Sequence, residues 1–348
     1  MASTSLFPDL LGDTIVDVSV IHAGQITLPT KHLITEPVPS HDNFNAPCFS
    51  FLVENKAKKE KLLFDLGLTK AWREKFPPAI VGMVESLEVD LHIEKDVADH
   101  LHEAEIPLKS INSIIWSHHH IDHIGDPSLF PSSTSLIVGP GFKSDKTIFP
   151  GYPTNPDAKT ADDAFRGREV VELDFSQVSL EIGGFPAMDY FGDGSFFLLQ
   201  TKGHTHDHIS ALARTKKDKF IFLGGGVAHH AGEFRPTAQL PLPDEMCCRS
   251  VIERSHPRKG ANLEDYRTIP FYQASPEINA SMADAEATVK KLQAFDASAE
   301  VFVIIAHDKD LLGILPDFPI KINDWDSKGY KPLGRWRFLE DFSRRPSD

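Results

Sequence analysis

The feature that most constrains the fold is a histidine-rich segment placed directly after an apolar strand. It reads Trp-Ser-His-His-His-Ile-Asp-His-Ile-Gly-Asp and covers residues 116–126. Successive side chains of an extended segment point to opposite sides, so His118, His120 and Asp122 share one side. His123 must then turn back toward them in the following loop. Because imidazole and carboxylate groups suit Zn²⁺ and other first-row divalent ions, this strand end predicts a metal site rather than a solvated histidine-rich loop.

Two further histidines stand at the ends of other predicted strands. His204 lies in a Gly-His-Thr turn after the strand Phe196–Leu199, and His307 follows the strand Val301–Ile305. Either histidine alone is more readily explained as a residue of a surface turn. If the carboxyl ends of these strands meet at one edge, however, the three segments converge on one cleft. The prediction therefore rests on the combination and not on any single motif.

The rest of the chain alternates short strands, loops and helices. Helices are predicted over Val89–Glu103 and over Met282–Phe295, the second with Ser281 as its N-cap. Two stretches rich in proline and glycine, 139–168 and 231–281, are long for plain connections, and we expect them to shape a pocket. No Gly/Ser linker divides the chain, which favours one layered α/β or α+β domain. Other strands are predicted at Ile15–Ile21, Cys48–Val53, Leu62–Phe64, Ser113–Trp116, Ser135–Val138, Ile209–Leu212 and Phe220–Leu223.

Composition limits the classes of function. The 348 residues include 36 Lys and Arg against 50 Asp and Glu, a formal charge of −14, which argues against nonspecific binding to nucleic acid or to an anionic membrane. No apolar run approaches the ~20 residues of a membrane span, and residues 1–15 lack the features of a signal peptide. The three cysteines, Cys48, Cys247 and Cys248, are too few for a disulfide framework and are interpreted as buried or bystander thiols. We therefore expect a cytoplasmic protein.

The order His-x-His-x-Asp-His, Gly-His-Thr and then a late histidine after a strand resembles the metallo-β-lactamase superfamily. The layout is most similar to its branch of N-acyl-homoserine lactonases and methyl parathion hydrolase. The resemblance covers residues 15–312 and implies a single α+β domain, a four-layer αβ/βα sandwich over residues 1–348 with 313–348 as a C-terminal extension. It also implies one or two Zn²⁺ ions, or other first-row divalent ions, at one edge of two facing sheets. By the resemblance, one metal is held by His118, His120 and His204, and the other by Asp122, His123 and His307.

The same resemblance assigns a role to Asp65 and exposes a departure at Gly226. Asp65, in Phe-Asp-Leu-Gly after a strand, matches an early Asp-x-Gly motif and is expected to orient a ligand imidazole; an ordinary Asp-Gly turn is the alternative. Gly226 stands where the family has the aspartate that bridges the two metals. The remaining possibilities are a mononuclear enzyme, a dinuclear site completed by water or another carboxylate, and an impaired metal- or ligand-binding protein. We expect nearer one metal than two, with Gly226→Asp raising the number; the candidates for a substitute carboxylate are Asp207, Glu233 and Asp308.

The chemistry implied is hydrolysis of an ester or lactone of a small molecule by a metal-activated water, with a thioester as the alternative. Asp122 is expected to accept and deliver a proton, and His229 to touch the substrate as a proton shuttle or oxyanion donor. A purely pocket-lining His229 is an equal alternative. His119 and His206 are expected to point away from the metal side. No nucleic-acid or membrane partner is expected, and a homodimer stays open.

Overall fold

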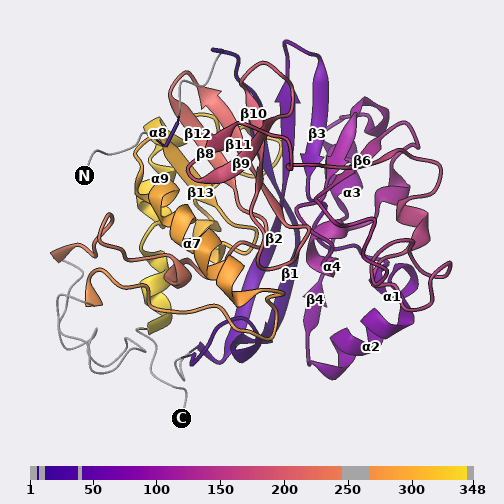
Figure 1. Cartoon of the computed structure of the whole chain (residues 1–348), viewed down its shortest axis with the longest axis horizontal. Helices are drawn as coiled ribbons and strands as arrows, with labels where there is room; N and C mark the ends of the chain where they lie inside the picture. Colours follow the sequence, from indigo (N-terminus) through magenta and orange to yellow (C-terminus); the bar gives the residue numbers. More distant parts are fainter. Residues whose placement is uncertain (1–5, 8–11, 38–40, 245–265, 343–348) are drawn as a thin grey trace.

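The computed structural model describes residues 6–7, 12–37, 41–244 and 266–342, and it shows two sheets packed face to face (Figure 1). The seven-stranded sheet has the order β4-β1-β2-β3-β5-β6-β7, and the six-stranded sheet β13-β12-β11-β10-β9-β8. The first consists of β1 (Asp17–Pro29), β2 (Asn43–Asn55), β3 (Glu60–Phe64), β4 (Asp90–His92), β5 (Ser113–Ile115), β6 (Ser135–Val138) and β7 (Val170–Glu172). The second consists of β8 (Glu181–Ile182), β9 (Phe185–Asp189), β10 (Phe196–Gln200), β11 (Ile209–Lys216), β12 (Lys219–Leu223) and β13 (Val301–Ile304).

Side chains alternate between the two faces of each strand, and both faces of both sheets are buried. Phe49 and Phe51 of β2 enter the core between the sheets, where they join Phe196 and Leu198 of β10. Leu52 of the same strand β2 lies on the other face, in the core under the helices of the first sheet. The helices are α1 (Trp72–Lys75), α2 (Pro78–Ser86), α3 (Val97–Glu103), α4 (Ile121–Ile124), α7 (Met282–Ala297), α8 (Trp325–Lys328) and α9 (Tyr330–Gly334).

Helices cover the outer face of each sheet, which completes four layers. Leu292 and Phe295 of α7 pack on the six-stranded sheet, while Val84 of α2 and Leu101 of α3 pack on the seven-stranded one. Figure 1 shows α7 on one side of the molecule and α1, α2 and α3 on the opposite side. The predicted αβ/βα sandwich is therefore confirmed.

One predicted helix is wrong over its first half, and the other is confirmed. Residues 90–92 of the expected helix Val89–Glu103 form β4, which pairs with β1. The helix α3 begins only at Val97, because Asp96 and Asp99 form a capping box in which Asp99 accepts from the Asp96 N–H at 2.9 Å. At α7, the Ser281 side chain accepts from the Asp284 N–H, as an N-cap should.

The described part of the expected C-terminal extension packs on the sandwich. Ile322 donates its N–H to Val18 of β1 at 2.8 Å, and the Asn323 amide accepts from the Val18 N–H. Trp325 is buried in the core between the sheets. Division of the chain into a core and an extension stays a prediction.

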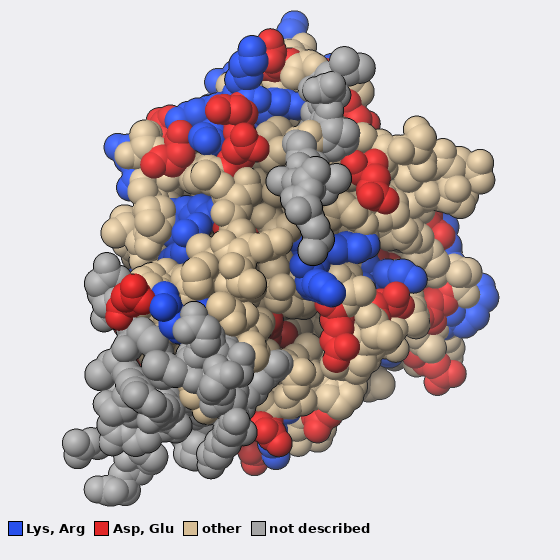
Figure 2. Space-filling model, turned by 60° about the vertical axis from the view of Figure 1, so that its left-hand side comes forward, with Lys and Arg blue, Asp and Glu red and all other residues tan. Residues whose placement is uncertain are grey.

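Surface charge is mixed on the face shown in Figure 2, where acidic and basic side chains lie among each other. The negative formal charge of −14 is thus not gathered into one block of that face. None of the helices in the described ranges is long and apolar enough to cross a membrane.

Candidate metal centre

The ends of four strands bring the predicted site residues to one edge of the sandwich. β3 and β5 are parallel, so Asp65 and His118 follow them at the same edge. β12 and β13 are also parallel and place Gly226 and His307 there. His204 reaches the same edge from the turn between β10 and β11. The convergence follows from strand direction, because parallel strands end on the same side of a sheet.

Three histidines form the first half of this centre. His118, His120 and His204 each offer a ring nitrogen, and the three nitrogens lie within 4.8 Å of one another. His204 Nε2 is 2.9 Å from His120 Nδ1. His118 Nε2 is buried and has no hydrogen-bond partner among the described residues. A buried ring nitrogen without a partner is unfavourable unless a ligand occupies the space in front of it.

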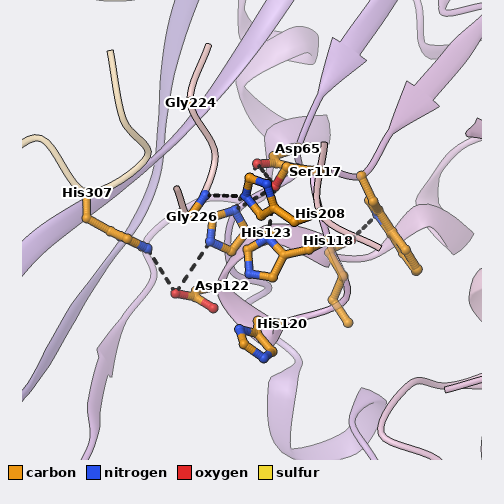
Figure 3. A network of polar contacts seen from close by, with 12 residues as sticks. Asp65, Ser117, His118, His120, Asp122, His123, His208, Gly224, Gly226 and His307 are labelled. Atoms are coloured by element: carbon orange, nitrogen blue, oxygen red, sulfur yellow. Dashed lines mark hydrogen bonds and ion pairs between the residues drawn. The ribbon is translucent and has the colours of Figure 1, made fainter. Parts of the chain in front are cut away.

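The orientation of two rings is set by Asp65 and Ser117 (Figure 3). Asp65 accepts from the Ser117 N–H at 2.6 Å and from the Ser117 hydroxyl at 2.8 Å. Its Oδ2 also lies 2.8 Å from His123 Nδ1, and the Ser117 hydroxyl lies 3.0 Å from His118 Nδ1. Both rings therefore place their protons on Nδ1 and present Nε2 to the centre, the arrangement typical of metal-binding histidines. Asp65 adopts a left-handed backbone with φ of 60°, a conformation that aspartate tolerates better than most residues.

The second half combines a carboxylate with two histidines. Asp122 Oδ2 lies 3.2 Å from His307 Nε2 and 3.8 Å from His123 Nε2. The Nδ1–H of His307 donates to the Pro47 carbonyl at 2.9 Å, which turns its Nε2 toward Asp122. The Cys48 sulfur, an Asp122 oxygen and a His307 nitrogen lie within 4.8 Å of one another. Sequence reasoning treated Cys48 as a bystander and missed this contact; Cys247 and Cys248 lie outside the described residues.

Protonation in the site suits a cation. Burial, then the neighbouring imidazoles, hold the pKa values of His118 and His204 well below their usual range. For His120, burial and then His119 lower the pKa to about 3. Burial acts to raise the pKa of Asp122, but His123 and His307 outweigh it and lower the pKa. Burial acts to lower the pKa of His123, but Asp122 and Asp65 outweigh it, so this pKa is raised instead. Neutral imidazoles in the first half and an ionised carboxylate in the second are the forms that bind divalent metals, so the residues present fit a metal centre.

Gly226 packs closely on the first half. Its N–H donates to His208 Nε2 at 3.0 Å. A Cβ at this position would lie 2.9 Å from His118 Cε1 and 2.9 Å from His204 Cδ2. His208, whose Nδ1 lies 2.9 Å from the Thr201 hydroxyl, thus supports the backbone under the centre. Its signal in the sequence was its place in Gly-His-Thr-His-Asp-His, which sequence reasoning used only for His204.

A cavity of about 710 Å³ opens onto both halves. His229 lies in its wall, with its ring centroid 4.8 Å from that of His204 and 5.7 Å from that of His307. Both long loops contribute lining residues, among them Ile148 and Ile278. The apolar lining comes mainly from β1, the segment after it, and α2, and includes Ile26, Leu28, Leu33, Phe44, Ile80, Met83, Val84, Leu87 and Val89.

His119 is placed differently from the expectation. It lines the cavity beside His120, and its Nδ1 lies 2.9 Å from Asp207 Oδ1. The alternation rule failed because β5 ends at Ile115 and residues 117–120 bend before α4 begins at Ile121. His206 is exposed at the cavity lining.

The candidate substitute carboxylates are engaged elsewhere. Asp207 pairs with His119, and Glu233 accepts from the N–H groups of His229 and His230 at 2.7 and 2.9 Å. Burial, followed by the charge of Asp310, raises the pKa of Asp308 to about 7. None of these three belongs to a metal-capable group with Asp122 among the described residues.

Comparisons with known proteins agree with this geometry. A family model described as the metallo-beta-lactamase superfamily matches residues 45–224. The chain is 37% identical to the gamma-lactamase FDB1 of Fusarium pseudograminearum, over 99% of this chain and 87% of that protein. It is 47% identical to the gamma-lactamase MBL2 of Gibberella moniliformis, over 66% of this chain and all of that protein. A solved N-acyl homoserine lactone hydrolase, with N-hexanoyl-L-homoserine at its catalytic metal center, matches with a TM-score of 0.61 at 16% identity and covers 89% of this chain and 100% of its own.

Proposed function

Since this chain belongs to the metallo-β-lactamase superfamily and is a hydrolase, we propose that it opens the ring of a small lactone by metal-dependent hydrolysis. The observation that supports this most is the convergence of three neutral imidazoles at the end of a largely apolar cavity of about 710 Å³. A volume of this size holds one small molecule. Water attack needs no serine or cysteine nucleophile.

His118, His120 and His204 would hold one metal, and Asp122, His123 and His307 the second. When bound, a divalent ion such as Zn²⁺ lowers the pKa of a water toward ~7 and polarises the scissile carbonyl. Asp65 and Ser117 keep the rings of His118 and His123 in the tautomer that presents Nε2. These contacts cost no reorganisation when substrate binds, because they already exist in the free protein.

The remaining steps fall to side chains on the cavity wall. Asp122 borders the cavity as an ionised carboxylate, so it can accept the proton of the attacking water and pass it to the leaving oxygen. His229 lies in the cavity wall near His204 and His307, and in this proposal it hydrogen-bonds the substrate carbonyl. The apolar wall formed by Ile80 and Val84 of α2 excludes water and favours an apolar substituent on the ring.

A γ-lactam is the second candidate substrate. Two relatives, at 37% and 47% identity, are named gamma-lactamases. Ring opening of a lactam differs in its leaving nitrogen, which needs a proton more than a lactone oxygen does. Asp122 can deliver that proton from the same position.

Hydrolysis of matched alkyl-substituted γ-lactones and γ-lactams, with an aryl ester and a thioester beside them, tests the proposal. We expect the ring substrates to be preferred, and removal of metal by a chelator to abolish turnover that Zn²⁺ restores. His118→Ala and His120→Ala should lower kcat/KM by more than the ~10–100-fold that changes behind a ligand cost. The fold should survive, because a two-sheet core does not depend on a metal as a zinc finger does.

His102→Ala is the matched control, since His102 is an exposed histidine of α3 that does not line the cavity. It should keep turnover close to that of the unchanged protein. Full activity in His118→Ala, or activity that survives complete removal of metal, would place the chemistry elsewhere.

A further inference from the structure

We propose that Cys48 is a ligand of the second metal position, where its thiolate supplies the negative charge that Gly226 cannot. The inference rests on the metal centre of the proposed function but not on any particular substrate. It adds one residue, from the middle of β2, to the set Asp122, His123 and His307.

Distances within the second half place the thiol in reach of a shared ion. The Cys48 sulfur, one Asp122 oxygen and one His307 nitrogen lie within 4.8 Å of one another. Ligand atoms of a tetrahedral Zn²⁺ are about 3.5 Å apart, given metal distances of ~2.0–2.1 Å to nitrogen and ~2.3 Å to sulfur. Closing the cluster on an ion therefore needs side-chain shifts on the order of 1 Å.

The backbone holds Cys48 against His307 from both sides. The residue before it, Pro47, accepts from His307 Nδ1 at 2.9 Å. The residue after it, Phe49, donates its N–H to the Ala306 carbonyl at 2.9 Å. Two hydrogen bonds thus lock β2 to the segment that carries His307, and the thiol between them cannot drift away without breaking one.

A thiolate at Cys48 would add negative charge to the second metal position. Gly226 offers no side-chain ligand, and Asp122 is the only carboxylate that groups with His307 in a metal-capable cluster of the described residues. One thiolate and one carboxylate together neutralise the charge of a divalent ion, which lowers the cost of burying it. On binding, the S–H bond of Cys48 breaks, a sulfur–metal bond forms and one proton leaves to the solvent. None of the candidate carboxylates Asp207, Glu233 and Asp308 shares a metal-capable group with Asp122 and His307 among the described residues.

An ordinary core thiol is the competing explanation. Cys48 is fully buried, and Ile26 and Leu68 pack beside it. In that case the sulfur keeps its proton, and a metal bound by Asp122, His123 and His307 has no sulfur ligand.

Cobalt substitution separates the two explanations without any assay of activity. The metal-free protein is titrated with Co²⁺ while the absorption spectrum and the metal content per chain are recorded. Coordination by a thiolate adds a charge-transfer band in the near ultraviolet, which nitrogen and oxygen ligands do not give. We expect this band to grow with Co²⁺ up to about one thiolate per chain, with nearer two metals than one bound at saturation.

Cys48→Ser should abolish the band and bring the metal content nearer to one per chain, while the double variant Cys247→Ser/Cys248→Ser should keep both. Cys48→Ala serves as a second variant. If neither variant folds, the double variant Cys247→Ser/Cys248→Ser decides, because Cys48 is then the only cysteine left in the chain. Saturation of the unchanged protein without a charge-transfer band would overturn the proposal, as would a band that persists in Cys48→Ser. A band in a protein with no hydrolase activity would support Cys48 and contradict only the proposed function.

Discussion

The two halves of the metal centre consist of different kinds of ligand. The half formed by His118, His120 and His204 contains only imidazoles, so it offers a divalent ion no negative charge. The half around Asp122 is anionic, with an ionised carboxylate and the Cys48 thiol beside it. A neutral set binds through lone pairs alone, whereas an anionic set gains charge neutralisation and then depends on which anions are present.

The halves also differ in what holds them. His118 is oriented by the adjacent Ser117, a local contact. His307 is oriented by Pro47, 260 residues away along the chain. Asp65 serves both, because it binds His123 directly and His118 through Ser117. Each half thus combines two residues of the segment 118–123 with one histidine from a distant strand end, and the second half adds the hydrogen bond from His307 to Pro47 of the other sheet.

Asp65→Asn should separate the halves most strongly. Asparagine keeps the left-handed backbone at this position but has one acceptor oxygen instead of two. It therefore cannot accept both from the Ser117 N–H and from the pair formed by His123 and the Ser117 hydroxyl. We expect metal affinity to fall about 10–100-fold, and more at the Asp122 half, since His123 contacts Asp65 directly. Titration against a competing chelator measures both steps. Asp174→Asn, an exposed aspartate, is the control; equal losses at both halves would contradict the asymmetry.

Substitution of Gly226 should instead weaken metal binding at the three-histidine half. A Cβ there would lie 2.9 Å from carbon atoms of His118 and His204. Gly226→Ala should therefore displace their rings and weaken metal binding several-fold, that is, by less than the ~1.4 kcal/mol that corresponds to a tenfold change. Gly226→Asp has the same crowding and adds a carboxylate. More metal per chain in the Asp variant than in the Ala variant would isolate the effect of charge. If Gly226→Ala binds metal as well as the unchanged protein, the crowding is harmless.

Glu233→Gln should leave the metal content unchanged and alter only the pH dependence of stability. Burial raises the pKa of Glu233 to about 7, from the ordinary value of 4.5. Folding therefore favours the protonated form of Glu233. Its contribution to the free energy of unfolding is greatest below pH ~4.5, falls as the pH rises to about 7, and does not change further above that pH. Relative to the unchanged protein, the glutamine variant should gain up to about 3 kcal/mol between pH 4.5 and 8.

Thermal unfolding of the metal-free proteins at both pH values measures this gain, with the exposed Glu286→Gln as the control. In Glu233→Gln, the side-chain Oε1 can still accept from the N–H groups of His229 and His230, so the turn is kept. A fall in metal content would instead make Glu233 a ligand and remove the need for Cys48.

Much of the architecture could be predicted from local pattern. The strands that carry the site, the N-cap of α7 at Ser281 and the segments that converge all follow from residues close together in the chain. The exception is instructive: the expected helix Val89–Glu103 has a suitable pattern, but residues 90–92 pair with the edge of β1. Hydrogen bonding to a strand elsewhere outweighed local helix preference, because propensities amount to less than ~1 kcal/mol per residue.

By itself, the sequence determined which chemical groups meet at the sheet edge. The residue types and spacing of 118–123 are typical of a metal site and of few other structures. His204 and His307 follow strands whose direction is set by the fold. Only the tertiary structure decided what stands behind and beside those groups. The contact of Cys48 with Asp122 and His307, the pairing of His119 with Asp207 and the support of Gly226 by His208 leave no periodic trace. Each depends on the register and packing of strands distant in the chain, and a side chain's neighbours across such a gap are set by long-range burial rather than by the residues next to it.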